Sequence, residues 1–269
     1  MFLKRCVAEL TQMKEAITRK HLWDKTMPLL RSTLGRGLGL LPSKWLLGRN
    51  FRRSCRFLQD AQWWPTEHAR EYQLDKLRQV VELAYQRTSF YRHLFDSVGF
   101  QPGDLRSLAD MKRLPTVNRQ AVLENVLTMC TRDVNGRDVD FGSTGGTSGI
   151  PLHLYLDANR SAVEYAYLTS GWARIGYTLH TPMAVFRGRV VRPDRHNLHH
   201  EYDPILRHHY YSSFHMSDES MGRYLQHIAT IGRCFLHVYP STVAALARFI
   251  LRTRASVPSN IRGIIAESE

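Results

Sequence analysis

The chain has 269 residues, enough to bury one large core or two modest ones. Its hydrophobic residues make up 43% of the sequence, an ordinary share that excludes a globally disordered chain. The net charge of +13 is uneven, because residues 1–56 hold 13 Lys and Arg against 3 Asp and Glu. The rest of the sequence is nearly balanced, so the charge describes an N-terminal segment and not the folded part.

Residues 1–56 are predicted to form a basic extension in which leucines and tryptophans alternate with charges. Such a segment could bind an anionic membrane surface or an acidic partner. We favour the simpler interpretation, in which its apolar residues pack on the main domain. Nucleic acid is the weakest alternative, because no helix-turn-helix, zinc-finger or RNP-like pattern accompanies the charge.

The cysteines and the hydropathy pattern together predict a cytoplasmic protein, peripheral to a membrane if the extension binds lipid. No run approaches the ~20 apolar residues that a membrane span needs. Glu9 and Lys14 interrupt the first apolar stretch before it reaches the length of a signal peptide. The four cysteines are far apart and include no C-x-x-C pair, which argues against a disulfide scaffold and a cysteine zinc site.

A long helix is predicted over 66–87, with Pro65 as its entry signal. Its apolar residues follow the i, i+3, i+4 spacing of one helix face: Leu74, Leu77, Val80, Val81 and Ala84. Glycines and a proline near residue 100 then break the chain. A second helix is predicted over 118–127, with Thr116 or Asn118 as its cap.

Residues 144–151, Thr-Gly-Gly-Thr-Ser-Gly-Ile-Pro, combine three glycines with three hydroxyl residues. Glycine lets backbone N–H groups approach a ligand closely, and hydroxyls donate hydrogen bonds to phosphate oxygens. Strand-like segments at 138–141 and 152–156 flank this stretch, so we predict a hairpin whose loop suits an anion.

Two common phosphate-binding motifs do not fit this loop. A Walker loop needs Lys and then Ser or Thr after its last glycine, whereas Ile150 and Pro151 follow Gly149. A dinucleotide fingerprint opens a helix, whereas another strand is predicted here. An ordinary turn between two strands remains the alternative on composition alone.

The second half of the sequence alternates predicted helices with predicted strands. The helices span 158–174, 218–231 with Ser217 as cap, and 241–254; the strands span 183–186, 234–239 and 262–266. We expect the first helix to pack through Val163, Ala166, Tyr167, Ser170 and Gly171. The alternation predicts an α/β fold with a largely parallel sheet.

Histidines and arginines crowd into one region of this half. The histidines are His196, His199, His200, His208, His209 and His215. Their spacing includes neither H-E-x-x-H nor paired cysteine ligands, so we expect no metal site. The arginines are Arg187, Arg189, Arg192 and Arg195. They could bind an anionic substrate, although an exposed basic loop explains them as well.

The loop and its surroundings resemble the adenylate-forming, or acyl-activating, enzymes, in their phenylacetate-CoA ligase and capsular-polysaccharide (CapK-like) branch. The resemblance covers roughly residues 57 to 269 and rests on several motifs in order. Upstream these are Tyr72-Gln73, Ser89-Phe90-Tyr91-Arg92, Gly99, Asp104-Leu105 and Leu114-Pro115; downstream they are Phe214-His215-Met216-Ser217, Tyr239-Pro240-Ser241 and 264–269.

The resemblance implies ATP and Mg²⁺ as cofactors, and a carboxylic acid activated as an acyl-adenylate and passed to CoA or an amine acceptor. It assigns Thr144, Gly145, Gly146, Thr147, Ser148 and Gly149 to the nucleotide phosphates. It places Tyr239, Ser241 and Glu269 at the acyl pocket. For Tyr239 to Ser241, a strand-to-helix turn with Ser241 as cap is an equal alternative. No catalytic residue is assigned.

The resemblance also implies a longer protein. Family members continue into an aromatic-Gly-x-Ser/Thr-Glu motif, a ribose-binding Asp and a C-terminal lid with a catalytic Lys, none of which the sequence contains. We therefore expect residues 57–269 to be the incomplete N-terminal part of a large domain, without the lid and inactive alone. The alternative is a remnant or interaction module that retains the fold. A reading frame that continues past Glu269 would favour the enzyme.

Overall fold

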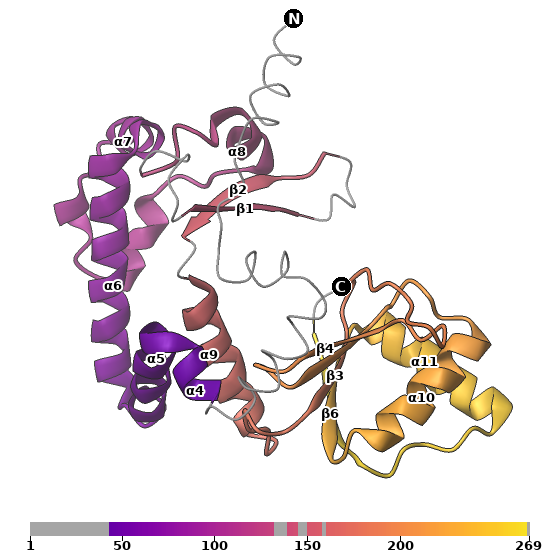
Figure 1. Cartoon of the computed structure of the whole chain (residues 1–269). Helices are drawn as coiled ribbons and strands as arrows, with labels where there is room; N and C mark the ends of the chain where they lie inside the picture. The colour runs from indigo at the N-terminus through magenta and orange to yellow at the C-terminus, as the bar shows by residue number, and fades with distance from the viewer. Residues whose placement is uncertain (1–42, 132–138, 145–149, 158–159, 268–269) are drawn as a thin grey trace, which may run out of the picture. The chain divides into compact units, whose positions relative to one another are not determined.

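The computed structural model describes residues 43–131, 139–144, 150–157 and 160–267 (Figure 1). Its described residues divide into two compact units. Unit 1 contains 59–161 and unit 2 contains 43–58 with 162–267. The predicted extension 1–56 lies mostly outside the described residues, so its proposed partners stay predictions. In the part of the chain that the structure describes, no helix combines the length and apolarity that crossing a membrane requires.

The last residues of the basic segment fold as helices α4 (Ser43–Leu46) and α5 (Gly48–Ala61). Phe51 on α5 is only 1% exposed and packs with Ala166 and Leu179 of unit 2. Leu47, between the two helices, joins the same cluster. Burial of these side chains removes apolar area from water, which stabilises the segment on the unit. For residues 43–58 the structure thus agrees with the packed interpretation.

Unit 1 is built on two helices, α6 (Thr66–Arg87) and α7 (Ser89–Asp96). The prediction for α6 is confirmed at both ends. Thr88 connects the helices: its hydroxyl donates to the Ala84 carbonyl at 2.8 Å and accepts from the Tyr91 N–H at 3.2 Å. One buried side chain therefore satisfies groups at the end of α6 and the start of α7.

The core of unit 1 lies between these helices and the segment that follows them. Its buried members are Val81, Phe95, Phe100 and Leu105. The chain continues through the short helices η1 (Pro102–Asp104) and η2 (Leu108–Arg113) to α8 (Arg119–Asn125). The Asn118 side chain accepts from the Ala121 N–H at 2.9 Å, which confirms one of the two predicted caps. Helix α8 ends two residues earlier than predicted.

Unit 1 closes with the hairpin of β1 (Val139–Ser143) and β2 (His153–Asp157). The strands pair antiparallel, from Val139 opposite Asp157 to Ser143 opposite His153. The predicted hairpin is thereby confirmed.

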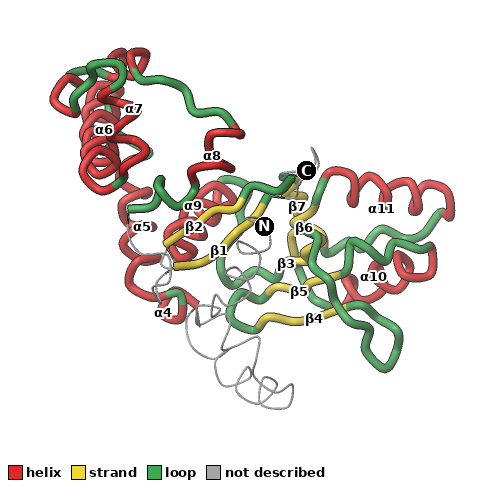
Figure 2. Tube along the Cα trace, turned by 90° about the horizontal axis from the view of Figure 1, so that it is seen from above, coloured by secondary structure: helices red, strands yellow, loops and turns green. Residues whose placement is uncertain are grey.

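Unit 2 contains a five-stranded sheet with the order β4-β5-β3-β6-β7. Figure 2 shows these strands one beside the next in this order. The strands are β3 (Met183–Phe186), β4 (His200–Asp203), β5 (His208–Tyr211), β6 (Cys234–Val238) and β7 (Ile261–Ala266). Strands β5, β3, β6 and β7 run parallel, and β4 pairs antiparallel with β5. The α/β prediction with a mostly parallel sheet is confirmed, but β4 and β5 were not predicted.

Helices cover both faces of this sheet, because successive strand residues point to opposite sides. On one face Ala184, Phe186 and Leu236 pack with Tyr224 and Ile228 of α10 (Asp218–Thr230). On the other face Met183, Val185 and Phe235 pack with Trp172 of α9 (Arg160–Ala173). Helix α11 (Pro240–Thr253) packs beside α10. Strands β3 and β6 are buried along their whole length, and their sequences are correspondingly apolar except for His237.

The packing face of α9 differs from the prediction. Its buried residues are Ala166, Thr169 and Trp172, whereas Val163 and Tyr167 are exposed. The expected face followed the small residues of the helix. The observed face instead follows its aromatics: Tyr165 and Trp172, two turns apart, face the core, and their rings contact edge to face.

Candidate functional site

Thr144 closes the base of the glycine-rich loop. Its backbone N–H donates to the Leu152 carbonyl at 3.0 Å, and the Leu152 N–H donates to its Oγ1 at 3.0 Å. Thr144 is exposed, and a hydroxyl that accepts one hydrogen bond can still donate another to an anion. The other predicted phosphate-binding residues, at 145–149, lie outside the described residues, as does Glu269, so their roles stay predictions.

A cation lies beside the far end of the loop. Arg119, the first residue of α8, donates from its guanidinium to the Ile150 carbonyl. Both residues are exposed. The loop itself contains no cation, and Leu152 follows Pro151. Arg119 brings a positive charge to the loop from 31 residues earlier in the chain, which no local motif could reveal.

A second set of polar residues gathers at the carboxyl ends of the parallel strands in unit 2. Arg187 follows β3, His237 is the penultimate residue of β6, and Glu267 follows β7. Arg187 Nη1 lies 2.8 Å from His237 Nε2 and 3.3 Å from Glu267 Oε2. Trp172 donates from Nε1 to Glu267 Oε1 at 3.1 Å. We call these four residues the strand-end cluster. In open α/β sheets, this edge is where ligands bind.

The electrostatics of the strand-end cluster favour a neutral imidazole. Burial, with the neighbouring Arg187 guanidinium, lowers the pKa of His237 to about 4, although Glu267 acts in the opposite direction. A neutral ring accepts the Arg187 hydrogen bond at Nε2 and so carries its own proton on Nδ1. Arg187 and Glu267 each remain about a quarter exposed, which leaves one cation and one anion accessible beside a buried ring.

Removing the guanidinium is expected to raise the pKa of His237. In Arg187→Met the lowering influence is gone while Glu267, 3.2 Å from Nε2, continues to favour the imidazolium. Titration of the histidine ring signals by NMR measures the shift. Arg195→Met, an exposed arginine of the same unit, is the matched control. An unchanged His237 pKa in Arg187→Met would contradict the described geometry.

Tyr239 borders the strand-end cluster, and its place at an acyl pocket stays a prediction. The Arg187 guanidinium lies 5.4 Å from its ring centroid. Gly188 has φ +63°, and a Cβ at that position would lie 3.3 Å from the Tyr239 ring. The glycine thus lets the ring approach the backbone closely. Ser241 is exposed in the first turn of α11, which begins at Pro240 with Tyr239 as its N-cap residue. The predicted strand-to-helix turn is therefore confirmed, and its predicted cap, Ser241, is wrong.

Sequence reasoning missed Trp172, His237 and Glu267, and offered Arg187 only as one of four arginines. A usable signal was present, because Arg187 and Glu267 each directly follow a predicted apolar strand. Of the other arginines, Arg189 pairs with Glu201 at 2.8 Å and stacks over Tyr210. The exposed-loop interpretation therefore fails for Arg187 and Arg189.

The buried His208 on β5 is expected to make the folded protein less stable in acid. Burial lowers the pKa of His208 to about 3, against 6.5 for an ordinary histidine. Between pH 6.5 and pH 3 the unfolded chain binds this proton and the folded chain does not, so the free energy of unfolding falls as the pH falls. Through His208 alone, the free energy of unfolding falls by up to about 1.4 kcal/mol for each pH unit in this range.

Urea denaturation at a series of pH values checks this expectation. His208→Gln should show a shallower pH dependence below pH 6.5 than the original chain, since its side chain takes up no proton in either state. The exposed His180→Gln should retain the original slope. Equal slopes for all three proteins would contradict a buried, neutral His208.

Comparison with known proteins identifies part of the chain as homologous to phenylacetate-coenzyme A ligases. The enzyme of Thermus thermophilus is 39% identical over 123 residues, which cover 43% of this chain and 27% of the relative. The enzyme of Aromatoleum evansii is 36% identical over 59 residues, or 22% of this chain and 13% of the relative. No family model matches the chain. The chain thus spans about a quarter or less of these relatives.

Solved structures of 2-hydroxyisobutyryl-CoA ligase share the fold. The open conformation in complex with 2-HIB-AMP and CoA aligns with a TM-score of 0.55 at 17% identity, over 76% of this chain and 45% of that one. The postadenylation state with 2-HIB-AMP aligns with a TM-score of 0.52 at 17% identity, over 76% and 44%. At this identity the likeness establishes the fold alone: the chain folds like part of these ligase structures.

Proposed function

We propose, from the partial homology to phenylacetate-coenzyme A ligases, that this chain takes part in the ATP-dependent activation of a carboxylic acid. In that reaction the carboxylate attacks the α-phosphate of ATP, giving an acyl-adenylate and pyrophosphate. The acyl group then passes to CoA or to an amine. The observation that carries the proposal is the hairpin β1–β2. The residues that connect its strands are rich in glycine and hydroxyl side chains, and part of the chain is homologous to phenylacetate-coenzyme A ligases.

The residues around the loop fit a polyphosphate. Thr144 offers a hydroxyl at the base of the loop, Arg119 brings a guanidinium to its far end, and both are exposed. We assign Thr144 and the five residues at 145–149 to the β- and γ-phosphates of ATP. Their task is to hold and orient charge, which needs positioned donors more than covalent chemistry. Mg²⁺ would accompany ATP and neutralise part of its charge.

We place the acyl side of the reaction at the carboxyl edge of the parallel strands, where Tyr239 and Ser241 were expected. Support comes from the strand-end cluster beside Tyr239, since a partly exposed guanidinium is a natural partner for a carboxylate. Glu269 keeps its proposed place at the edge of this pocket. The identity of the acid follows from screening, because acyl pockets are shaped by scattered apolar side chains.

ATP–pyrophosphate exchange tests the proposal. Aryl, fatty and amino acids are offered in parallel to this chain and to the longest product of its reading frame. Acid-dependent exchange in the longer protein supports the ligase. If no acid of the panel gives exchange and MgATP does not bind, the interaction module that retains the fold is the better account, and a partner search beginning with residues 1–56 becomes the next step.

A further inference from the structure

Three histidines from three separate elements meet on one side of the unit 2 sheet. His200 lies on β4, His209 on β5 and His227 on α10, and each offers a ring nitrogen within 4.8 Å of the others. His200 Nε2 and His209 Nδ1 are 3.0 Å apart. The rings of His200 and His227 have centroids 4.2 Å apart. We call these residues the histidine trio.

Strand register explains how two of these side chains come to share a face. In the antiparallel pair β4–β5, Tyr202 lies opposite His209. His200 lies two residues before Tyr202 and therefore points to the same side of the sheet. His227 is outside the histidine-rich segment and reaches the pair from α10. The expectation of no metal site rested on the spacing of histidines in the sequence, and that spacing does not show which residues the fold brings together.

A buried tyrosine orients the third histidine. The Tyr211 hydroxyl lies 2.7 Å from His227 Nδ1, and Tyr211 is fully buried with its ring stacked on Phe186. This contact engages Nδ1 and leaves Nε2 as the His227 nitrogen available to a metal. Metal-binding histidines usually have such an outer partner, which fixes the ring and its tautomer.

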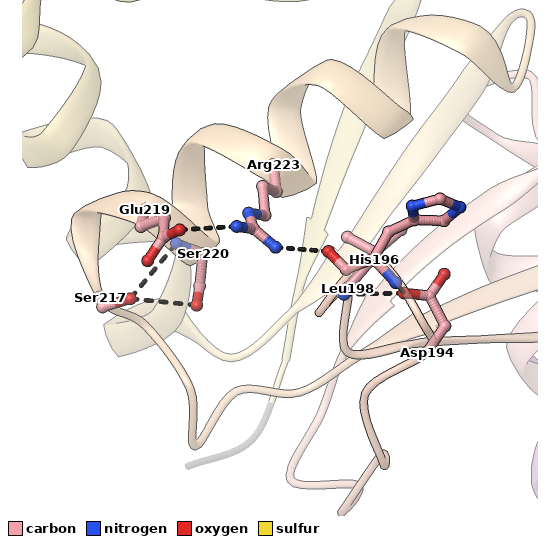
Figure 3. Close-up of polar contacts among 7 residues, drawn as sticks. All are labelled: Asp194, His196, Leu198, Ser217, Glu219, Ser220 and Arg223. Atoms are coloured by element: carbon pink, nitrogen blue, oxygen red, sulfur yellow. Dashed lines mark hydrogen bonds and ion pairs between the residues drawn. The ribbon is translucent and has the colours of Figure 1, made fainter.

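Contacts outside the trio join α10 to the segment that precedes β4; Figure 3 shows them. Arg223, one turn before His227, donates to the His196 carbonyl and pairs with Glu219 at 2.6 Å. The Asp194 carboxylate accepts from the N–H groups of His196 and Leu198 at 2.8 and 3.0 Å. These contacts tie the segment before β4 to α10. They help to hold His200 near His227 independently of the contacts among the three histidines.

The trio carries lone pairs and little positive charge at neutral pH. Burial, with the neighbouring rings, lowers the pKa of His200 to about 3 and that of His209 to about 4. Burial also lowers the pKa of His227, against the opposing influence of Asp194. Neutral imidazoles are the form that binds a metal; binding opens the His200–His209 hydrogen bond and shifts its proton to the other nitrogen of the donor ring, with no net proton released.

We propose that His200, His209 and His227 form a three-imidazole site for a divalent transition-metal cation, with Zn²⁺ as the expected ion. Zinc accepts imidazole nitrogens at about 2.0–2.1 Å, so two of its ligands lie a little over 3 Å apart, a separation close to that of His200 and His209. An all-imidazole set disfavours Mg²⁺ and Ca²⁺, which prefer oxygen. The ion would join the β4–β5 hairpin to α10.

Zinc titration of the untagged, chelator-treated 269-residue chain tests the proposal. We expect one Zn²⁺ per chain by calorimetry and a rise in melting temperature, because the ion binds the folded state. His209→Gln and His227→Gln should each weaken binding at least tenfold. The exposed His196→Gln is the matched control and should bind as the original chain does. Equal zinc affinity in all four proteins would overturn the proposal.

Two further measurements keep the proposal testable if a histidine variant fails to fold. Tyr211→Phe retains the buried ring and all three ligands, and loss of the outer contact should weaken zinc binding about 10- to 100-fold. Cobalt(II) bound to the original chain should give the visible bands of a four-coordinate site of three imidazoles and a water, without a thiolate band. A thiolate band, or no binding of either ion in the micromolar range, would overturn the site.

Discussion

Gly146→Asp is expected to reduce acid-dependent pyrophosphate exchange by about two orders of magnitude or more, the loss that follows when a major electrostatic contact of a transition state is removed. The substitution places a carboxylate among the donors assigned to the ATP phosphates. Like charges a few ångströms apart repel strongly, and the new side chain also occupies space that glycine leaves to the ligand. Initial exchange rates, with saturating acid and varied ATP, measure the effect.

Gly103→Asp is the matched control for this experiment. Gly103 also belongs to unit 1, and a Cβ at its position meets no heavy atom within 4 Å. The same chemical change there should leave exchange at the level of the original protein. Exchange undiminished by Gly146→Asp would remove the loop from the mechanism, whereas equal losses in both variants would point to a general effect of the added charge.

Phe186→Ala is expected to lower the free energy of unfolding of unit 2 by about 3–5 kcal/mol, the usual cost of truncating a buried phenylalanine. Phe186 is 1% exposed at the end of β3. Its ring stacks on Tyr211 with centroids 4.8 Å apart and meets Tyr224 edge to face at 5.5 Å. Truncation would leave a cavity between the sheet and α10 that these large rings cannot readily fill.

Urea denaturation of Phe186→Ala and Phe214→Ala provides the comparison. Phe214 is 64% exposed in the same unit, and its truncation should change the free energy of unfolding by less than about 0.5 kcal/mol. Comparable losses in the two variants would mean that Phe186 does not lie in the core described for the sheet.

The elements that the sequence predicted well have strong local signals. Helix α6 has a proline at its entry and apolar residues at helical spacing, and both its ends were predicted correctly. Helix α10 has Ser217 as its cap, whose hydroxyl accepts from the Ser220 N–H at 3.2 Å. Strands β3 and β6 are apolar apart from His237, because helices cover both sheet faces. In each case the physical cause is contained within a few neighbouring residues.

The elements that were missed lack such signals. Strands β4 and β5 consist largely of histidine, tyrosine and acidic residues, so neither shows the aliphatic run of a buried strand. Their burial comes from tertiary packing: His208 is only 4% exposed, with Tyr165 Oη at 3.3 Å from its Nε2. Aromatic and imidazole rings fill the space that aliphatic side chains fill elsewhere, and a composition-based prediction reads them as a polar loop.

The candidate sites divide in the same way. The glycine-rich loop and Tyr239 were predicted because each belongs to a contiguous motif. The strand-end cluster and the histidine trio were not, since their members come from separate elements that only strand order and register bring together. The spacing of residues in a sequence predicts that they lie close together only when they belong to the same helix or turn.

The long separation within the strand-end cluster bears on how the protein is made. Trp172 and Glu267 are 95 positions apart, and the carboxylate follows the strand that pairs last with β6. A ribosome delivers the chain from the N-terminus, so Arg187 and His237 emerge while their anion is still unsynthesised. The contacts of Arg187 and His237 with Glu267 therefore cannot form before β7 has been synthesised and has paired with β6.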